Sequence, residues 1–214
     1  MGILNNSRHY LGQRGQYLTF TAEEDETVVN FILGSYITRT NIEYLSYSTN
    51  GGITWTKTTI PTQRTSLTIP VTINAGKSVI WKGEGTNVSA NSGASKFSCT
   101  KPCSLSGNIM SLLYGDDFSD KTTIPSTYAF YGIFNSAKIT TAHELELPAT
   151  TMTANCYENM FNSCTLLTTA PKLPATTLAN SCYNHMFYKC SSLTTAPDLL
   201  ATTLVNRCYN YMFY

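Results

Sequence analysis

The sequence is poor in charged residues. Asp, Glu, Lys and Arg make up 13% of 214 residues and leave a formal net charge of +1, against roughly 25% charged residues in typical soluble domains. No segment is basic enough to attract a polyanion, so nucleic acid is not an expected partner. No apolar run approaches the roughly 18 residues of a membrane span, and the first residues lack the apolar segment of a secretory signal. We therefore expect a chain made in the cytoplasm without membrane insertion, unless a leader has been removed.

Residues suited to catalysis are few and scattered. The three histidines, His9, His143 and His185, fall in separate parts of the chain. Asp116 and Asp117 are adjacent, so their side chains diverge on a regular backbone and do not face each other as an acid and base pair would. We therefore expect no catalytic site, no enzyme activity and no cofactor.

The second half of the chain consists of sequence repeats. Residues 147–172 align with residues 173–198 at a constant offset of 26 residues. A third copy begins at Leu199 and is incomplete, and residues 122–151 form a degenerate copy with small insertions. Repeats of this length predict stacked units that each contact only their neighbours.

Comparison of the repeats tests whether Cys182, His185 and Cys190 could hold a metal ion. Cys182, His185 and Cys190 have a C-x2-H-x4-C spacing that is compatible with part of a zinc site. The position of His185 is Asn159 one unit earlier and Tyr211 one unit later, so a stack supplies one isolated imidazole and no fourth ligand. Structural zinc requires four protein ligands. We therefore expect no metal.

The spacing within each unit predicts a helix. Leu178, Cys182, Met186 and Cys190 recur every four residues, which places them on one face of an α-helix. The cysteines would then act as small buried hydrophobes, aligned in ladders from unit to unit. The total of seven cysteines is odd, which favours reduced thiols, although the pair in "CTKPC" could be oxidised.

After each expected helix comes the sequence "LTTAP", an alternating run that ends in proline. It predicts one short strand per unit, with Leu167 and Thr169 pointing into the core. The outward positions of two successive units are Thr168, Ala170 and Lys172, then Thr194, Ala196 and Asp198. Stacked strands would form an open parallel surface, which is the natural place for a ligand.

Other positions vary between units while the core positions stay fixed. One series is Asn159, His185 and Tyr211, and the other is Asn162, Tyr188 and Tyr214. Exposed tyrosine can stack on a sugar ring or pack against a neighbouring subunit. We therefore add His185, Tyr188, Tyr211 and Tyr214 to the candidate binding residues.

The pattern "LPATTLANSCYNHMFYKCSSLTTAP" resembles the BspA-type leucine-rich repeat of surface proteins from gut Bacteroidetes and of proteins from their phages. The resemblance implies a curved α/β solenoid and a role in adhesion or recognition. It transfers no specific binding residue. The chain has a small β domain, followed by "GNIMSLLYGDDF" and then by these repeats. This order is similar to that of whole proteins encoded by gut Bacteroides and crAss-like phages.

The first half predicts a different architecture. Between residues 17 and 100, six short runs rich in β-branched and aromatic residues alternate with turn residues, which favours an antiparallel β-sandwich. The turn at Asn50-Gly51-Gly52 can accept positive φ and join two strands. The segment "STNGGITW" resembles the Asp-box hairpin of sialidases, which implies a structural turn and no active site. The acidic run 23–26 is expected to be a solvated turn.

The expected fold is thus a mainly β sandwich followed by an α/β leucine-rich-repeat solenoid. The expected segments are an N-terminal arm (1–16), the sandwich (17–105), a joint or cap (106–121) and the repeats (122–214). Arg8 and Arg14 of the arm could anchor it to other proteins, although a disordered tail is the alternative.

These features lead to a functional hypothesis. Repeats typical of surface proteins, in a chain without an export signal, favour a phage fibre or decoration protein that assembles in the host cytoplasm. Its arm and sandwich would bind other virion proteins, and its repeats would bind a host-surface glycan or protein, most readily as a homo-oligomer. The alternative is a bacterial cell-surface adhesin whose leader is missing. A glycan-processing enzyme is a weaker third hypothesis, because no cluster of acidic residues supports it.

Overall fold

The computed structural model describes residues 16–63, 67–90 and 94–214. Arg8, Arg14 and nearly all of the expected arm lie outside the described residues, so virion anchoring stays a prediction. The strands are β1 (Leu18–Ala22), β2 (Thr27–Ile32), β3 (Ile42–Ser48), β4 (Thr56–Thr59), β5 (Thr68–Ile73), β6 (Ser78–Gly85), β7 (Lys96–Cys99), β8 (Cys103–Asn108) and β9 (Ile139–Glu146). A single helical turn, α2 (Ser111–Tyr114), and a short 3-10 helix, η1 (Gly115–Asp117), follow β8.

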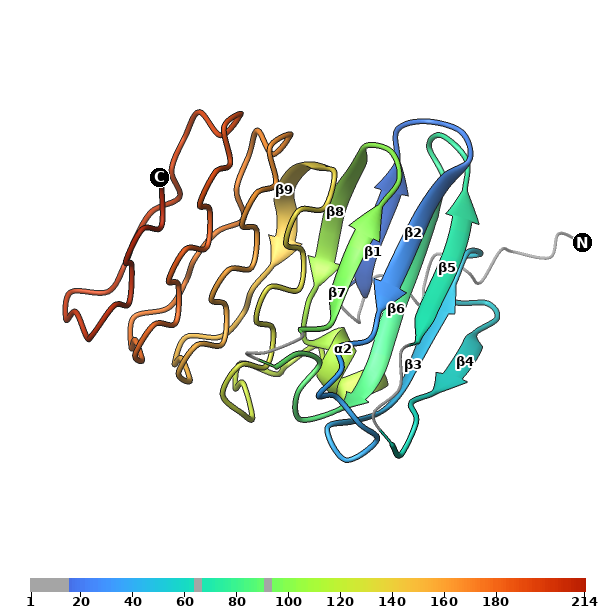
Figure 1. Ribbon diagram of the computed structural model, residues 1–214, viewed down its shortest axis with the longest axis horizontal. Helices are drawn as coiled ribbons and strands as arrows, with labels where there is room; N and C mark the ends of the chain where they lie inside the picture. The colour runs from blue at the N-terminus through green and yellow to red at the C-terminus, as the bar shows by residue number, and fades with distance from the viewer. Residues whose placement is uncertain (1–15, 64–66, 91–93) are drawn as a thin grey trace, which may run out of the picture.

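The first half forms a sandwich-like pair of sheets. The larger sheet has the strand order β4-β3-β6-β1-β8-β9, and the smaller has the order β5-β2-β7. Figure 1 shows the smaller sheet in front of the larger one. A cluster of buried rings fills the core, with the Phe97 centroid 4.9 Å from Phe20, 5.1 Å from Phe31 and 5.1 Å from Trp81. All six predicted runs are strands, which supports a mainly β, sandwich-like first half.

The expected α/β class is wrong, because the repeats contain no helix in the part of the chain that the structure describes. The described part of the protein is mainly β, with 31% of its residues in strands or isolated bridges and 4% in helices. In Figure 1 the repeats are irregular coils stacked beside β9. Every fourth residue has a positive φ, as at Asn155 (59°), Asn159 (57°) and Ser163 (61°), and an α-helix admits none.

The hydrogen bonds explain how these coils form. Within a coil, alternate amides bond three residues back, as from Met160 to the Tyr157 carbonyl at 3.2 Å. The intervening amides bond to the next coil, as from Tyr157 to the Cys182 carbonyl at 3.0 Å. A succession of four-residue turns returns each fourth side chain to the same face, as a helix does. The period of four in the sequence therefore predicts the buried residues correctly, but it does not imply the helical backbone that we expected.

Rings and thiols fill the inside of the stack. The rings of Phe134, Phe161 and Phe187 form a column with successive centroids 5.3 and 5.6 Å apart. The five repeat cysteines are buried, and the Cys190 thiol donates to the Phe161 carbonyl at 3.0 Å. The prediction that these cysteines are small buried side chains is confirmed, although they lie in turns. All seven cysteines of the chain are free thiols.

The expectation of one strand per repeat is also wrong. Thr169 pairs with Thr141 and with Thr195 only as isolated parallel bridges, and β9 is the one strand in the described residues after 121. Thr169 is exposed, whereas it was expected to point into the core; Pro171 is buried in its place. Proline lacks the amide that would extend the pairing, which limits each bridge to a single residue.

The two halves share a sheet and a core. β8 of the sandwich pairs in parallel with β9 of the first repeat, and Ile109 donates to the Glu146 carbonyl at 3.2 Å. The segment after β8 buries Ile109, Met110, Leu112 and Leu113. Parallel pairing leads directly into the coils, so the first repeat continues the larger sheet of the sandwich.

Candidate functional site

The stacked coils form a groove next to the Thr169–Thr195 bridge. It has a volume of about 580 Å³, within the range of roughly 300–1,000 Å³ that is usual for small-ligand sites. Three ionisable side chains, His143, Lys172 and Asp198, line it. The rest of its lining is threonine, alanine, proline and leucine: Thr169, Ala170, Pro171, Leu173, Pro174, Thr195, Ala196, Pro197 and Leu200.

Two of the three ionisable residues of the groove, Lys172 and Asp198, occupy equivalent positions of successive units. The register of the Thr141–Thr169–Thr195 bridges makes Glu144, Lys172 and Asp198 equivalent. Lys172 has no ion pair in the part of the chain that the structure describes. A second cavity of about 450 Å³ shares His143, Lys172 and Pro174 with the first and extends to Glu144. The two cavities therefore form one line of sites along the stack.

The sequence identified this surface only in part. Lys172 and Asp198 line the groove as candidate residues, but Thr169 and Thr195 line it in place of Thr168 and Thr194. The hydroxyl of Thr168 donates to the Thr140 carbonyl at 2.8 Å and so ties two coils together. His143, Pro171 and Leu200 were missed. The bridges of Thr169 to Thr141 and Thr195 bring His143 and Leu200 to this groove, which the sequence alone does not show.

The other four candidate residues form a separate aromatic cluster on the coils. His185 stacks on Tyr211 with centroids 5.2 Å apart, and Tyr188 stacks on Tyr214 at 5.3 Å. The two stacks meet edge to face, with His185 and Tyr188 at 5.2 Å. None of the four lines the groove.

Stacking limits what the aromatic cluster can bind. One face of Tyr188 lies against Tyr214, and Lys189 Nζ lies 5.1 Å from the Tyr188 centroid. A sugar needs a free ring face for stacking, so Tyr188 is a poorer platform than its sequence position suggests. Tyr211 and Tyr214 are 57% and 75% exposed and keep an outer face.

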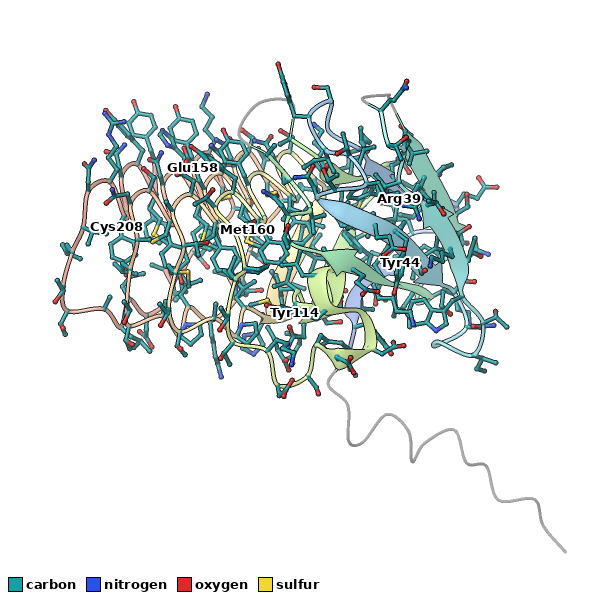
Figure 2. The ribbon with its side chains drawn as sticks, turned by 90° about the horizontal axis from the view of Figure 1, so that it is seen from below. Arg39, Tyr44, Tyr114, Glu158, Met160 and Cys208 are labelled. Atoms are coloured by element: carbon teal, nitrogen blue, oxygen red, sulfur yellow. The ribbon has the colours of Figure 1, made fainter. Side chains whose placement is uncertain are left out.

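A ladder of polar side chains runs beside the rings and was missed in the sequence. Asn184 donates to Glu158 Oε1 at 2.8 Å, and Asn210 donates to Asn184 Oδ1 at 3.1 Å. Asn155 donates to the other oxygen of Glu158. In Figure 2 Glu158 lies on the outer side of the coils, whereas the buried Met160 lies within them. The equivalence of Glu158, Asn184 and Asn210 at an offset of 26 residues is the signal that could have revealed the ladder.

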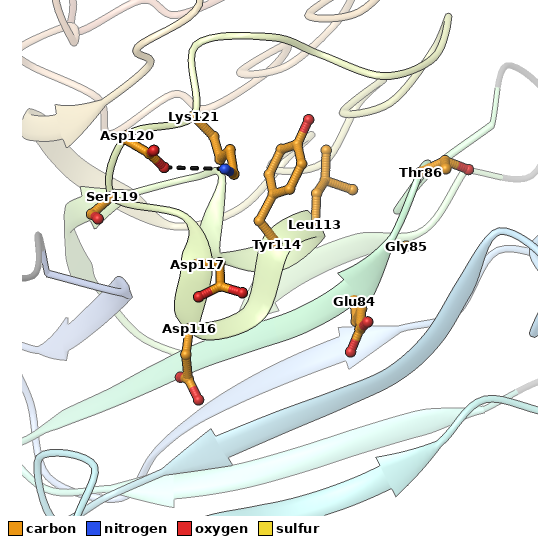
Figure 3. Close-up of a pocket in the computed structure, with 10 residues that line it drawn as sticks. All are labelled: Glu84, Gly85, Thr86, Leu113, Tyr114, Asp116, Asp117, Ser119, Asp120 and Lys121. Carbon is orange, nitrogen blue, oxygen red and sulfur yellow. Dashed lines mark ion pairs between the residues drawn. The ribbon is translucent and has the colours of Figure 1, made fainter.

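A third cavity of about 680 Å³ lies at the joint, and Figure 3 shows the acidic side chains around it. Asp116 is bound by Lys82 Nζ at 2.8 Å and by the Tyr17 hydroxyl at 2.7 Å. Asp120 pairs with Lys121 at 3.2 Å. Asp116 therefore links β6 to η1, which is a structural role.

The described residues contain no group of three or more His, Cys, Asp or Glu side chains that could hold a metal ion. His185 belongs to the aromatic cluster, and Cys190 donates to a carbonyl of the preceding coil. Burial raises the pKa of both Cys182 and Cys190 to about 11, which disfavours the thiolate that metal binding requires.

The Asp-box-like turn joins β3 to β4. Gly51 and Gly52 have φ of 72° and 88°. The Asn50 Oδ1 atom accepts from the Thr54 amide at 3.0 Å and from the Ser48 hydroxyl at 2.8 Å. These bonds all close the turn on itself, so Asn50 has a structural role here.

No helix among the described residues is both long and apolar enough to span a membrane. The comparisons with known proteins gave no match: no protein-family model, no curated protein and no solved structure is significantly similar to this chain.

Proposed function

We propose that this protein is a non-enzymatic recognition protein of a phage particle, and that it binds a host-surface glycan in the groove at Lys172 and Asp198. The observation that carries this proposal is a fixed frame beside one variable position. The run Thr-Ala-Pro at 169–171 recurs at 195–197, whereas the next position changes from Lys172 to Asp198. Glu144, Lys172 and Asp198 occupy that one position. A fixed scaffold with one variable position is the arrangement expected of a binding surface.

The chemistry of the groove suits a saccharide. The hydroxyls of Thr169 and Thr195, with Lys172 and Asp198, supply both donors and acceptors for sugar hydroxyls. Proline and leucine side chains supply the apolar surface on which the C–H groups of a sugar ring can pack. The adjoining cavity at His143 lengthens the site along the stack, which favours a chain of sugars over a single one.

Placement on a virion rests on the resemblance of the repeats to those of gut bacteria and their phages. In this proposal the sandwich contacts other virion proteins, and several copies assemble around a symmetry axis. A bacterial cell-surface adhesin with the same groove is the alternative. Electron microscopy of labelled particles distinguishes the two: antibody bound to the virion supports the first, and antibody bound only to bacterial cells supports the second.

Single substitutions test the groove. Lys172→Ala and Asp198→Ala should each weaken binding on a glycan array, or to host cells, by about tenfold, the loss expected for one charge-assisted hydrogen bond. Lys77→Ala is the matched control, because Lys77 is exposed in the turn between β5 and β6. Unchanged binding in both groove variants would contradict the proposal. Loss on Tyr188→Ala alone would move the ligand to the aromatic cluster.

A further inference from the structure

Three charged side chains, one from each of three successive coils, stand in a row along the groove and its adjoining cavity. They are Glu144, Lys172 and Asp198, and each lies three residues after one of the bridged threonines. We call these three residues the charge row. Their charges alternate from coil to coil in the order negative, positive, negative.

The charge row holds much of the charge of the stack. Residues 139–214 contain seven Asp, Glu, Lys and Arg residues, and three of the seven stand in this row. The Thr-Ala-Pro run that precedes Lys172 and Asp198 is uncharged and is the same in both coils. Charges that served only solubility could stand on any exposed side of the coils. Their concentration beside the groove therefore indicates a role in binding.

The charges of the row are available to a ligand. All three residues are exposed, and no ion pair joins two of them in the part of the chain that the structure describes. Glu144 Oε1 lies 3.5 Å from His143 Nε2, and such an exposed pair is weak. Glu146, the other carboxylate of the adjoining cavity, accepts a hydrogen bond from Asn108 Nδ2 at 3.2 Å.

The threonine bridges set the spacing of the charge row. Parallel chains that pair through their backbones lie about 5 Å apart, so successive charges are about 5 Å apart along the stack. One sugar of an extended β-linked chain advances by a similar length, so successive sugars can each meet one coil. Glu144 and Asp198 are two coils apart, which exceeds the Debye length of about 8 Å at physiological ionic strength. Their mutual repulsion is therefore largely screened.

We infer that the glycan bound in this groove is zwitterionic, with ammonium groups facing Glu144 and Asp198 and an anionic group facing Lys172. An uncharged sugar chain would remove water from the three charges without pairing them, which costs free energy. A polyanion would meet two carboxylates and a polycation would meet Lys172, and like charges that face each other lower the affinity. The inference rests on the proposed function, because it names the class of glycan for the same groove.

Four oligosaccharides of equal length and different charge test this inference on the full chain. Those of chitin are neutral, those of chitosan cationic and those of hyaluronan anionic, whereas de-N-acetylated hyaluronan alternates ammonium and carboxylate groups. Calorimetric titrations at about pH 6 keep the carboxylates ionised and the glucosamine amines protonated. We expect the zwitterionic probe to bind at least about tenfold more tightly than the other three, the gain from one further charge-assisted hydrogen bond. Equal or tighter binding of another probe would overturn the inference.

An exchange of two charges tests the order of the row. Lys172→Asp combined with Asp198→Lys keeps the net charge and removes the alternation. This variant should bind the zwitterionic probe about tenfold more weakly than the unchanged protein does. Glu24→Lys combined with Lys77→Glu is the matched control, because both residues are exposed in turns of the sandwich, and its binding should be unchanged. Full binding by the Lys172 and Asp198 variant, with an unchanged melting temperature, would overturn the inference.

The same titrations separate this inference from the proposed function. If the neutral probe binds as tightly as the zwitterionic one and Lys172→Ala weakens both, the inference fails and the groove remains a glycan site. If none of the four probes binds, the inference also fails, and the glycan array and host cells still test the groove. If Lys172→Ala and Asp198→Ala leave the binding of every probe unchanged, both proposals fail.

Discussion

Replacing Ser181 by glycine should stabilise the protein. Ser181 has a φ of 55° and donates its amide to the Asn206 carbonyl at 3.0 Å. An L-residue in this conformation costs about 1–2 kcal/mol, which glycine avoids. Glycine also gives the unfolded chain more freedom, at a cost of roughly 0.5–1 kcal/mol. The expected net gain in the free energy of unfolding is about 0.5–1 kcal/mol. For a protein of this size each kcal/mol raises the melting temperature by about 2–4 °C.

The sign of this change discriminates between the turns and a helix. In an α-helix, glycine in place of serine would lower stability by about 0.5 kcal/mol. Ser181→Val sharpens the contrast: valine and serine have similar helix propensities, but a β-branched residue at positive φ is strained by about 1–3 kcal/mol. The turns therefore predict that glycine stabilises and valine destabilises.

Denaturant unfolding followed by fluorescence or circular dichroism measures both changes. Ser191→Gly is the matched control, because Ser191 is exposed and is not among the residues with positive φ. This control should lose about 0.5–1 kcal/mol from the entropy of the unfolded chain alone. A loss of stability on Ser181→Gly, together with an unchanged Ser181→Val variant, would refute the coil conformation.

Four further predictions concern the repeats. Phe161→Ala should lower the free energy of unfolding by about 3–5 kcal/mol, because the ring is fully buried in its column; a loss under about 1 kcal/mol in denaturant titrations would contradict the packing. Burial raises the pKa of Cys182 and Cys190 from 9.0 to about 11. The folded state thus holds these protons more tightly than the unfolded state. The contribution of the two thiols to the free energy of unfolding should be constant below pH 9 and fall as the pH rises from 9 to 11. A free energy of unfolding that increased over that range would contradict the burial of the thiols. A bulky thiol reagent should label neither cysteine at neutral pH until denaturant is added. Glu158→Gln should lower the free energy of unfolding by about 1–2 kcal/mol, because the carboxylate accepts hydrogen bonds from Asn184 and a second asparagine. Thermal unfolding measures this change. An unchanged melting temperature would exclude the ladder as a stabilising element.

The strands of the sandwich were predictable because their signal is local. In β5, buried residues such as Val71 and Ile73 alternate with exposed ones, and this pattern appears directly in the sequence. The turn after β3 was predictable for the same reason, since Gly51 and Gly52 supply the positive φ that it needs.

The candidate binding residues could be identified only in part. The alternation of the LTTAP run identified Lys172, and variation between units identified Tyr188. Neither pattern could show that Lys172 lines a groove and that Tyr188 lies in a stack of rings. That distinction depends on the neighbours of each residue in the adjacent coils. It also depends on the Thr141–Thr169 bridge, which joins residues 28 positions apart, whereas the units align at 26.

The sequence by itself determined that the second half is a stack of repeated units and which side chains of each unit are buried. The recurrence of Cys182 and Met186 every four residues was sufficient for that, because helices and four-residue turns both bring every fourth side chain to one face. Only the tertiary structure decided between them. Half of the amides that a helix would satisfy within itself donate to the next coil, as Tyr157 does to Cys182, and a bond between units leaves no local pattern from which it could be predicted.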